Sequence, residues 1–211
     1  MHHYLLQFAT VAVAHLLAVM SPGPDFAVVT KNSLSHSRKA GIYTALGIAL
    51  GLSVHITYSL LGIGFIISRS IILFNIIKLV GAGYLIYIGY KAVQSKPVSV
   101  LTEKEHVSVS SGMKPLAAVK NGFLVNALNP KATLFFLALF TQVIDPTTPT
   151  VIKLGYGVEM MIATFVWFSI VAVLFSHGTL RAKIQRAQHW IDRTTGVVLI
   201  AIGLKVAFSH R

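Results

Sequence analysis

Two charged residues of this sequence lie inside long apolar runs, and each follows a proline. Asp25 ends the motif Ser21-Pro22-Gly23-Pro24-Asp25, which interrupts the apolar run 5–29. Lys131 follows Pro130 inside the apolar run 123–140. An acid in apolar surroundings can hold a cation or a proton, and a base can pair with it. These two places are therefore the first candidates for a binding or coupling site.

The prolines predict breaks in the helices at both places. Pro22 and Pro24 remove two amide donors, and Gly23 permits dihedral angles that other residues avoid. One interpretation ends the helix at Met20 and makes the motif a surface turn. The other is a broken helix end whose free backbone groups and carboxylate face a substrate path. We favour the second, because sequences accept unpaired backbone in hydrocarbon mainly where it lines a cavity or packs on protein.

The second break carries two amide side chains. Pro130 leaves the carbonyl near Asn126 without its helical donor. Asn126 and Asn129 are three residues apart, so they share a helix face and can bond freed backbone, a substrate or each other. Two alternatives remain open for Lys131: its side chain extends toward the cytoplasm, or it pairs with Asp25 across the molecule.

Three other titratable residues lie inside apolar runs. His55 is one turn beyond Gly51, on the same helix face, and a proton-coupling role and an uncharged ring bonded to a neighbouring span are both open. The same alternatives apply to His15. Glu159 is the only acid of its run. It is a candidate for coupling by its position, but it could also reach the membrane interface.

The composition predicts an integral membrane protein, whose helices must position these residues. Of the 211 residues, 55% are hydrophobic and 11% are charged, whereas about 25% are charged in soluble domains. A helix that spans a membrane needs about 20 consecutive, mostly apolar residues. We expect an all-α protein with six spans, near 5–29, 41–67, 70–92, 119–144, 150–176 and 192–209.

The segment 94–118 predicts a division into two halves. It is polar, and it separates a first half, 1–93, from a second half, 119–211, within one transporter domain. Three spans in each half reverse the direction of the second half in the membrane, so we expect two inverted three-helix repeats. Each half begins with a span that is broken by proline.

The positive charges predict the orientation. The net charge is +12, and most basic residues fall in connections on one side, at Lys31, Arg38, Lys39, Lys91, Lys96, Lys104, Lys114, Lys120, Arg181, Lys183, Arg186 and Arg193. The positive-inside rule puts that side in the cytoplasm and both termini outside it. The basic excess thus has an explanation that requires no nucleic acid.

Small residues predict close packing of helices. Gly47 and Gly51 form a GxxxG pattern in the second span, which lets helix backbones approach each other. Gly81 and Tyr84 lie one turn apart in the third span. We expect packing roles for all four, with the Tyr84 hydroxyl as an alternative pathway group. A homo-oligomer that packs through glycine faces remains open.

The sequence offers no catalytic or cofactor motif. It has no cysteine, and we find no metal cluster, phosphate loop, nucleophile motif or pair of catalytic carboxylates. We therefore expect no metal, no cofactor and no enzyme activity.

Several segments resemble the LysE/RhtB family of amino-acid exporters. They are SPGPD, GIYTALGIALGLSVHITYSLLGIG, KLVGAGYLIYIGYKA, NGFLVNALNPKATLFFLALF and WIDRTTGVVLIAIGLKVAF. The combination of SPGPD with a later NPK is the specific part. The resemblance implies a six-span carrier of the bacterial inner membrane that exports amino acids or related metabolites in exchange for protons. It also implies functional roles for residues 21–25 and 129–131.

We therefore expect an alternating-access exporter whose two breaks face each other. Asp25 and helix carbonyls would hold the substrate ammonium, and free amides its carboxylate. Protonation of Asp25, His55 or Glu159 would couple transport to protons. The alternatives are a carrier of another solute or ion, a non-transporting accessory protein, and an intramembrane enzyme.

Overall fold

The computed structural model describes residues 2–21, 23–69, 71–94, 113–145, 147–176, 190, 193–194, 196–201, 203–204 and 207–208. Its helices are α1 (His2–Met20), α2 (Pro24–Ser35), α3 (Arg38–Arg69), α4 (Ile71–Val93), α5 (Pro115–Ala127), α6 (Pro130–Gln142) and α7 (Thr150–Phe175). Over the described residues the protein is thus all-helical, as predicted.

Two of the predicted spans are pairs of helices. The predicted span 5–29 consists of α1 and α2, whose axes differ by 54°, and the predicted span 119–144 consists of α5 and α6, which differ by 57°. Hydropathy records only that each segment is apolar, so it does not reveal a change of direction. Among the described residues, two helices are long and apolar enough to cross a membrane, or four if each bent pair is one span.

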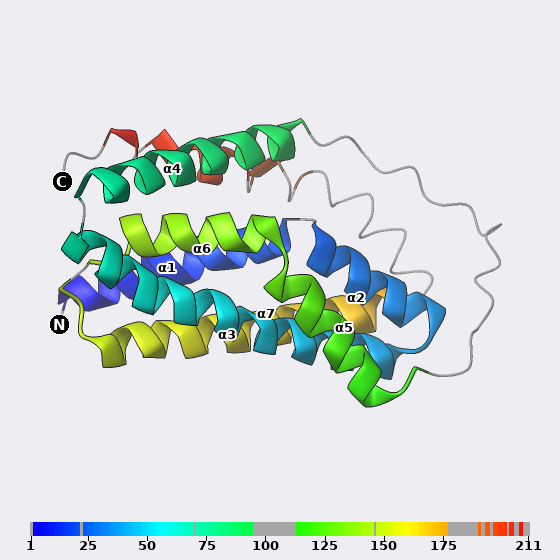
Figure 1. Cartoon of the computed structure of the whole chain (residues 1–211). Helices are drawn as coiled ribbons and strands as arrows, with labels where there is room; N and C mark the ends of the chain where they lie inside the picture. Colours follow the sequence, from blue (N-terminus) through cyan, green and yellow to red (C-terminus); the bar gives the residue numbers. More distant parts are fainter. Residues whose placement is uncertain are drawn as a thin grey trace.

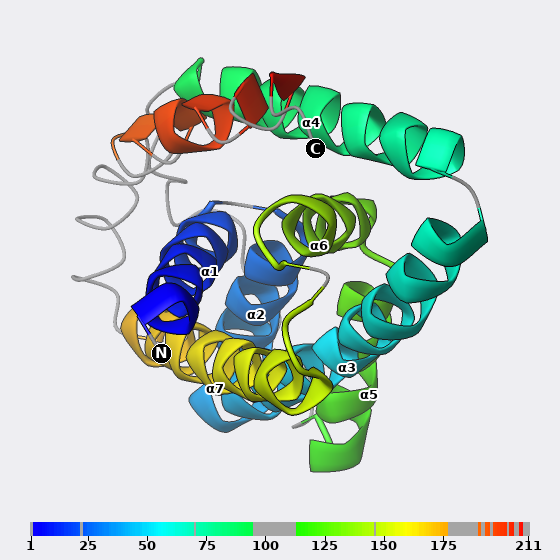
Figure 2. The ribbon, with the colours of Figure 1, turned by 90° about the vertical axis from the view of Figure 1, so that its left-hand side faces the viewer.

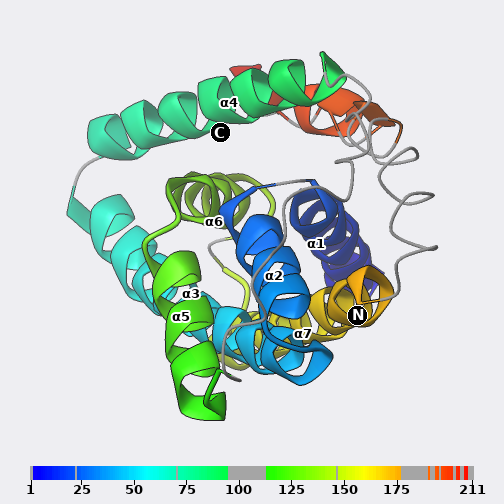
Figure 3. The same ribbon diagram turned by 90° about the vertical axis from the view of Figure 1, so that its right-hand side faces the viewer.

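The two bent pairs lie side by side within one bundle. Figure 1 shows α1 beside α6 and α2 beside α5, with α3 and α7 along the same bundle. The views along the bundle, from its two ends, show α1, α2, α3, α6 and α7 grouped together (Figures 2 and 3). The helices α2 and α6 both begin with a proline, and the two breaks lie beside each other near the middle of the bundle (Figure 1).

The helix α4 lies on the outside of this group and contacts it mainly through α6 (Figure 2). The described C-terminal residues run along it (Figures 1 and 2). Gly89 of α4 approaches Gly196 so closely that a Cβ at Gly89 would lie 2.7 Å from the Gly196 carbonyl oxygen. This close approach requires small residues on both segments.

Large apolar side chains cover much of the outside of the bundle. Leu5, Leu6 and Val13 of α1 are more than half exposed, and so are Val158 and Ile162 of α7. The side chains between the helices are mostly apolar too, with Val11, Ile48, Met160 and Leu199 fully buried. A surface this apolar is suited to a lipid bilayer rather than to water.

Candidate functional site

The first break separates α1 from α2 by three residues. Ser21 still donates its backbone N–H to the Leu17 carbonyl at 3.1 Å, and α2 then begins at Pro24. The N-cap Gly23 has φ −172° and ψ −169°. This is extended backbone that any residue can adopt, so Gly23 does not use the wider range of dihedral angles that glycine permits. Pro22 lies outside the described residues.

The second break is held by its own N-cap. Asn129 precedes Pro130, and its side-chain oxygen accepts the backbone N–H of Lys131 at 3.0 Å. Such a cap satisfies one amide of the first turn of α6. The Asn129 amide nitrogen stays free for another partner. That partner belongs to the other break.

Asp25 accepts hydrogen bonds from both asparagine side chains. The Nδ2 atoms of Asn126 and Asn129 each donate to Asp25 Oδ2 at 3.0 Å. The other oxygen, Oδ1, is buried and has no hydrogen-bond partner among the described residues. Amide donors to a carboxylate are charge-assisted bonds that stabilise its ionised form. Half of this carboxylate is therefore anchored, and half is available to a ligand.

Lys131 reaches back to the first break. Its Nζ donates to the Ser21 carbonyl at 2.7 Å and to the Ala18 carbonyl at 3.3 Å. The residue four positions after Ala18 is a proline, which cannot donate to it. The Lys131 ammonium thus replaces backbone donors that the first break lacks, instead of extending away from the bundle.

His55 serves the second break in the same way. Its Nε2 lies 2.9 Å from the Asn126 carbonyl oxygen, whose helical donor would be residue 130 and which also accepts the Asn129 backbone N–H at 2.9 Å. Its Nδ1 lies 2.9 Å from the Tyr58 hydroxyl, which also lies 3.3 Å from the Thr133 carbonyl oxygen and has one hydrogen for these two acceptors when the ring is neutral. His55 is fully buried and stacks on Phe136 at 5.5 Å between ring centroids. Both of its nitrogens therefore have partners.

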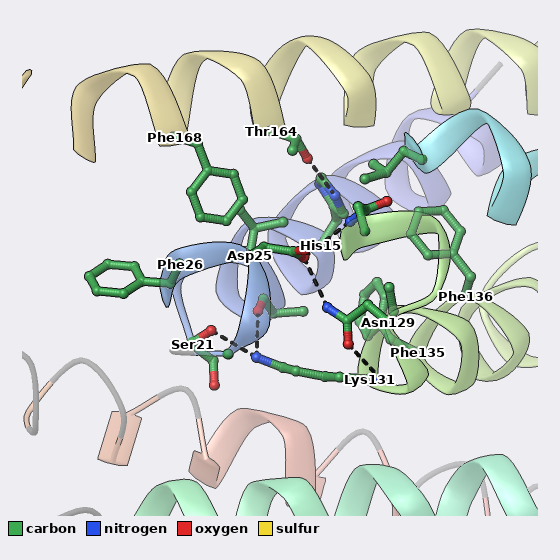
Figure 4. Close-up of a pocket in the computed structure, with 16 residues that line it drawn as sticks. His15, Ser21, Asp25, Phe26, Asn129, Lys131, Phe135, Phe136, Thr164 and Phe168 are labelled. Atoms are coloured by element: carbon green, nitrogen blue, oxygen red, sulfur yellow. Dashed lines mark hydrogen bonds between the residues drawn. The ribbon is translucent and has the colours of Figure 1, made fainter. Parts of the chain in front are cut away.

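A cavity opens between the two breaks. It holds about 460 Å³ of empty space, its open mouth included, and Ser21, Gly23, Asp25, Asn126, Asn129 and Lys131 line it. Aromatic side chains of α2, α6 and α7 form much of the rest, among them Phe26, Phe135, Phe136 and Phe168 (Figure 4). The arrangement can bind a small molecule with a positive group, because a half-free carboxylate faces an otherwise largely apolar space.

Some predicted site residues do not reach this cavity. Glu159 is half-buried on α7 and does not line it. Gly47 and Gly51 pack on α5. Tyr84 is half-buried on α4, with its ring 6.3 Å from that of Tyr87. Gly81 lies in α4, but the packing around it is outside the described residues.

Two cavity residues received little or no weight from the sequence. His15 of α1 and Thr164 of α7 line the cavity, and the Thr164 hydroxyl lies 3.2 Å from His15 Nε2 (Figure 4). Both are polar residues midway along apolar runs, which is the signal that could have found them. Position alone cannot tell which face of a helix such a residue occupies relative to its neighbours.

A second polar cluster lies at the other end of α1. The buried Gln7 accepts the hydroxyls of Thr148 and Tyr156 at 3.0 and 3.1 Å and donates to the Val143 carbonyl at 3.1 Å. These bonds join α1, the connection between α6 and α7, and α7 itself. They close that end of the bundle with satisfied polar groups.

Broken helices that meet beside a cavity inside an apolar bundle are the architecture of secondary transporters. The fold and the site thus define the class as an integral membrane carrier. The chain belongs to the LysE type translocator family, whose model matches residues 16–210.

The relatives cover almost the whole chain. It is 33% identical over 210 residues to the threonine efflux protein of Escherichia coli (strain K12), covering 98% of this chain and 100% of the relative. It is 30% identical over 212 residues to an uncharacterised membrane protein of Bacillus subtilis (strain 168), covering 98% and 100%. It is 26% identical over 206 residues to the leucine efflux protein of Klebsiella pneumoniae, covering 96% and 95%. No solved structure matches the chain.

Proposed function

We propose that this chain exports amino acids from the bacterial cytoplasm by alternating access, in exchange for protons. The observation that carries the proposal is the buried Asp25 Oδ1 beside the cavity, which no described residue partners. Relatives named for threonine and leucine efflux support an amino acid as the substrate. The chain then acts as a carrier and not as an enzyme.

The binding mode follows from the first break. The substrate ammonium binds to Asp25 Oδ1, where a full charge replaces the missing hydrogen-bond donor. The carboxylate binds near the first turn of α2, whose early amides have no acceptor within the helix. The positive end of the helix dipole favours an anion there. Both charged groups of a zwitterion are thus held within one turn of helix.

Asp25 also gives the simplest coupling to protons. A carboxylate that releases an ammonium and takes up a proton becomes neutral, which permits the empty carrier to return. Glu159 lies outside the cavity, and both nitrogens of His55 have partners. Asp25 is therefore the residue at which substrate and proton compete directly.

The proposed carrier has six spans in two inverted halves, 1–93 and 119–211, joined by a cytoplasmic segment, 94–118. In this arrangement α4 and the segment 192–209 are the third and sixth spans. The termini lie in the periplasm, and the Gln7 cluster closes the periplasmic side of the cavity. Opening to that side then requires these bonds to break.

The test is efflux from liposomes that contain the purified full chain and are loaded with labelled amino acids. Acidifying the outside should accelerate efflux by the wild type, because protons enter as the substrate leaves. Asp25→Asn removes the charge that holds the ammonium and should lower driven efflux by at least about 30-fold.

The matched control is Asp145→Asn, the same change in the α6–α7 connection. There the Asp145 side chain does not line the cavity, so its charge is no part of the proposed binding site. Its efflux should stay near that of the wild type. Full acid-driven efflux by a folded Asp25→Asn protein would overturn the proposed role of Asp25.

A further inference from the structure

Within the described part of the chain, one ring nitrogen of His15 has a hydrogen-bond partner and the other has none. The side chain is 1% exposed and lines the same cavity as Asp25. Its Nε2 lies 3.2 Å from the Thr164 hydroxyl, and its Nδ1 has no hydrogen-bond partner among the described residues. Buried polar groups normally have hydrogen-bond partners, so a polar atom without one, on a side chain that lines a cavity, is a candidate contact for a ligand.

The two aromatic neighbours of His15 offer no hydrogen-bond acceptor. Its ring lies 6.3 Å from the ring of Phe135 and 6.2 Å from that of Phe136. Both rings are apolar walls of the cavity. Figure 4 shows the His15 ring at the cavity, between Thr164 and the site of Asp25. A group that enters the cavity is therefore what remains to pair with Nδ1.

The hydrogen bond to Thr164 determines which ring nitrogen of His15 carries the proton. Thr164 is fully buried, and its hydroxyl has one described partner, His15 Nε2. When the hydroxyl donates to Nε2, its hydrogen is used and the ring proton sits on Nδ1. The reverse arrangement leaves the threonine hydrogen and the Nδ1 lone pair both unpaired. The arrangement with fewer unpaired groups puts an N–H donor on Nδ1 of a side chain that lines the cavity.

We propose that His15 is the residue that determines specificity, because its Nδ1–H donates to a polar group on the substrate side chain. The inference rests on the proposed function, in which Asp25 holds the ammonium that all amino acids share. A side chain with a hydroxyl accepts this hydrogen bond. An aliphatic side chain of equal size leaves the buried donor unpaired, and sites built around a hydrogen bond reject such analogues strongly.

The test compares threonine with valine, which differ by a hydroxyl in place of a methyl group. Liposomes with the purified full chain are loaded with either labelled amino acid, and initial efflux is measured. The wild type should prefer threonine by about 10-fold or more. His15→Gln keeps a polar atom near Nε2 and loses the one at Nδ1, so its threonine-to-valine ratio should fall toward one.

His15→Asn is the matched variant, because its amide nitrogen lies near the place of Nδ1. It should keep a threonine preference that His15→Gln loses. A merely structural role of His15 would instead lower the efflux of both amino acids equally in both variants. An equal loss would also follow if Nδ1 held the substrate carboxylate, so that result overturns the proposal.

A binding measurement on the wild type needs no variant to fold. Threonine should raise the melting temperature of the detergent-solubilised protein at lower concentrations than valine does, because a ligand stabilises the state it binds. Equal effects of threonine and valine, together with equal efflux, refute the role of His15 and leave the exporter proposal intact. Absence of efflux for every amino acid tested refutes the proposed function itself.

Discussion

Each break is capped by a side chain from the other half of the sequence. Lys131, from α6, donates to the carbonyls of Ala18 and Ser21. His55, from α3, bonds the Asn126 carbonyl. Asparagines of the second half in turn hold Asp25 of the first. Polar backbone within an apolar bundle is thereby satisfied by contacts that also hold the halves together.

Replacing His55 should reveal its capping role through stability. In His55→Phe the aromatic contact can persist, but the buried Asn126 carbonyl loses one of its two donors and keeps only the Asn129 N–H, which costs about 0.5–1.5 kcal/mol. Pro130→Ala introduces an amide that can reach the same carbonyl. The cost of His55→Phe should therefore be about 1 kcal/mol smaller in the Pro130→Ala background. Denaturant unfolding of the four detergent-solubilised proteins measures this difference.

The loss of the His55–Tyr58 contact is common to both backgrounds, so it cancels in the comparison. Equal costs of His55→Phe with and without Pro130 would show that the histidine does not substitute for the missing amide. A larger cost in the Pro130→Ala background would contradict the role equally.

For individual residues, the sequence predicted which backbone groups lose a hydrogen-bond partner, but not which side chains replace that partner. Pro130 indicates by its chemistry that a carbonyl near Asn126 lacks its helical donor four residues on. The residue that supplies the donor depends on how α3 is placed against α5 and α6. Lys131 shows the same limit, because a long flexible side chain reaches many partners and only the folded arrangement selects the carbonyls of the first break.

The packing of α3 on α5 depends on glycines from both helices. A Cβ on Gly47 would collide with the Val119 carbonyl and lie 2.8 Å from the Phe123 nitrogen. A Cβ on Gly122 would collide with the Thr44 carbonyl. These obstacles are backbone atoms, which cannot rotate away. The buried Asn32 adds a polar contact nearby by donating to Thr44 and Asn121 at 2.9 and 3.0 Å.

Alanine at these glycines should separate α3 from α5. Gly122→Ala and Gly47→Ala should each destabilise the protein by about 1–3 kcal/mol, because overpacking forces the backbones apart. Gly83→Ala and Gly155→Ala are the controls, since a Cβ at either has nothing within 4 Å. Those two should be neutral or stabilising by up to about 1 kcal/mol, because alanine favours helix more than glycine does.

The midpoint of unfolding in detergent measures all four variants. A neutral Gly122→Ala protein would show that the helices are farther apart than the structure places them. The GxxxG pattern predicted close packing at Gly47 and Gly51, but the partner could not be read from it. Gly122 lies four residues after Ala118, which is a small-xxx-small pair rather than GxxxG, and its contact with Thr44 follows only from the structure.

The molecule contains the same local arrangement once in each half. In each half a short helix begins with proline directly after the break, and the next residue is charged, Asp25 in the first and Lys131 in the second. The two bends are of similar size, 54° and 57°. Paired breaks of this kind are what we expect from a duplicated unit whose copies run oppositely through the membrane.

The ends of the bundle differ in charge in a way that supports the proposed orientation. The connection between α2 and α3 and the start of α5 lie at one end, opposite the N-terminus and the α6–α7 connection (Figure 1). Lys31, Arg38 and Lys39 flank the first of these connections, and Lys114 and Lys120 flank the start of α5. The positive-inside rule assigns this end to the cytoplasm.

The absence of cysteine from the chain makes this orientation directly testable. Thr147→Cys and Lys39→Cys each introduce one thiol at an exposed position, at opposite ends of the bundle. In intact cells a membrane-impermeant maleimide should label Thr147→Cys. It should label Lys39→Cys only after the cells are permeabilised, and a permeant maleimide should label both. The reverse pattern would place the α6–α7 connection and the Gln7 cluster in the cytoplasm. The cavity would then be closed toward the cytoplasm by those bonds, and the same structure would represent the opposite step of an export cycle.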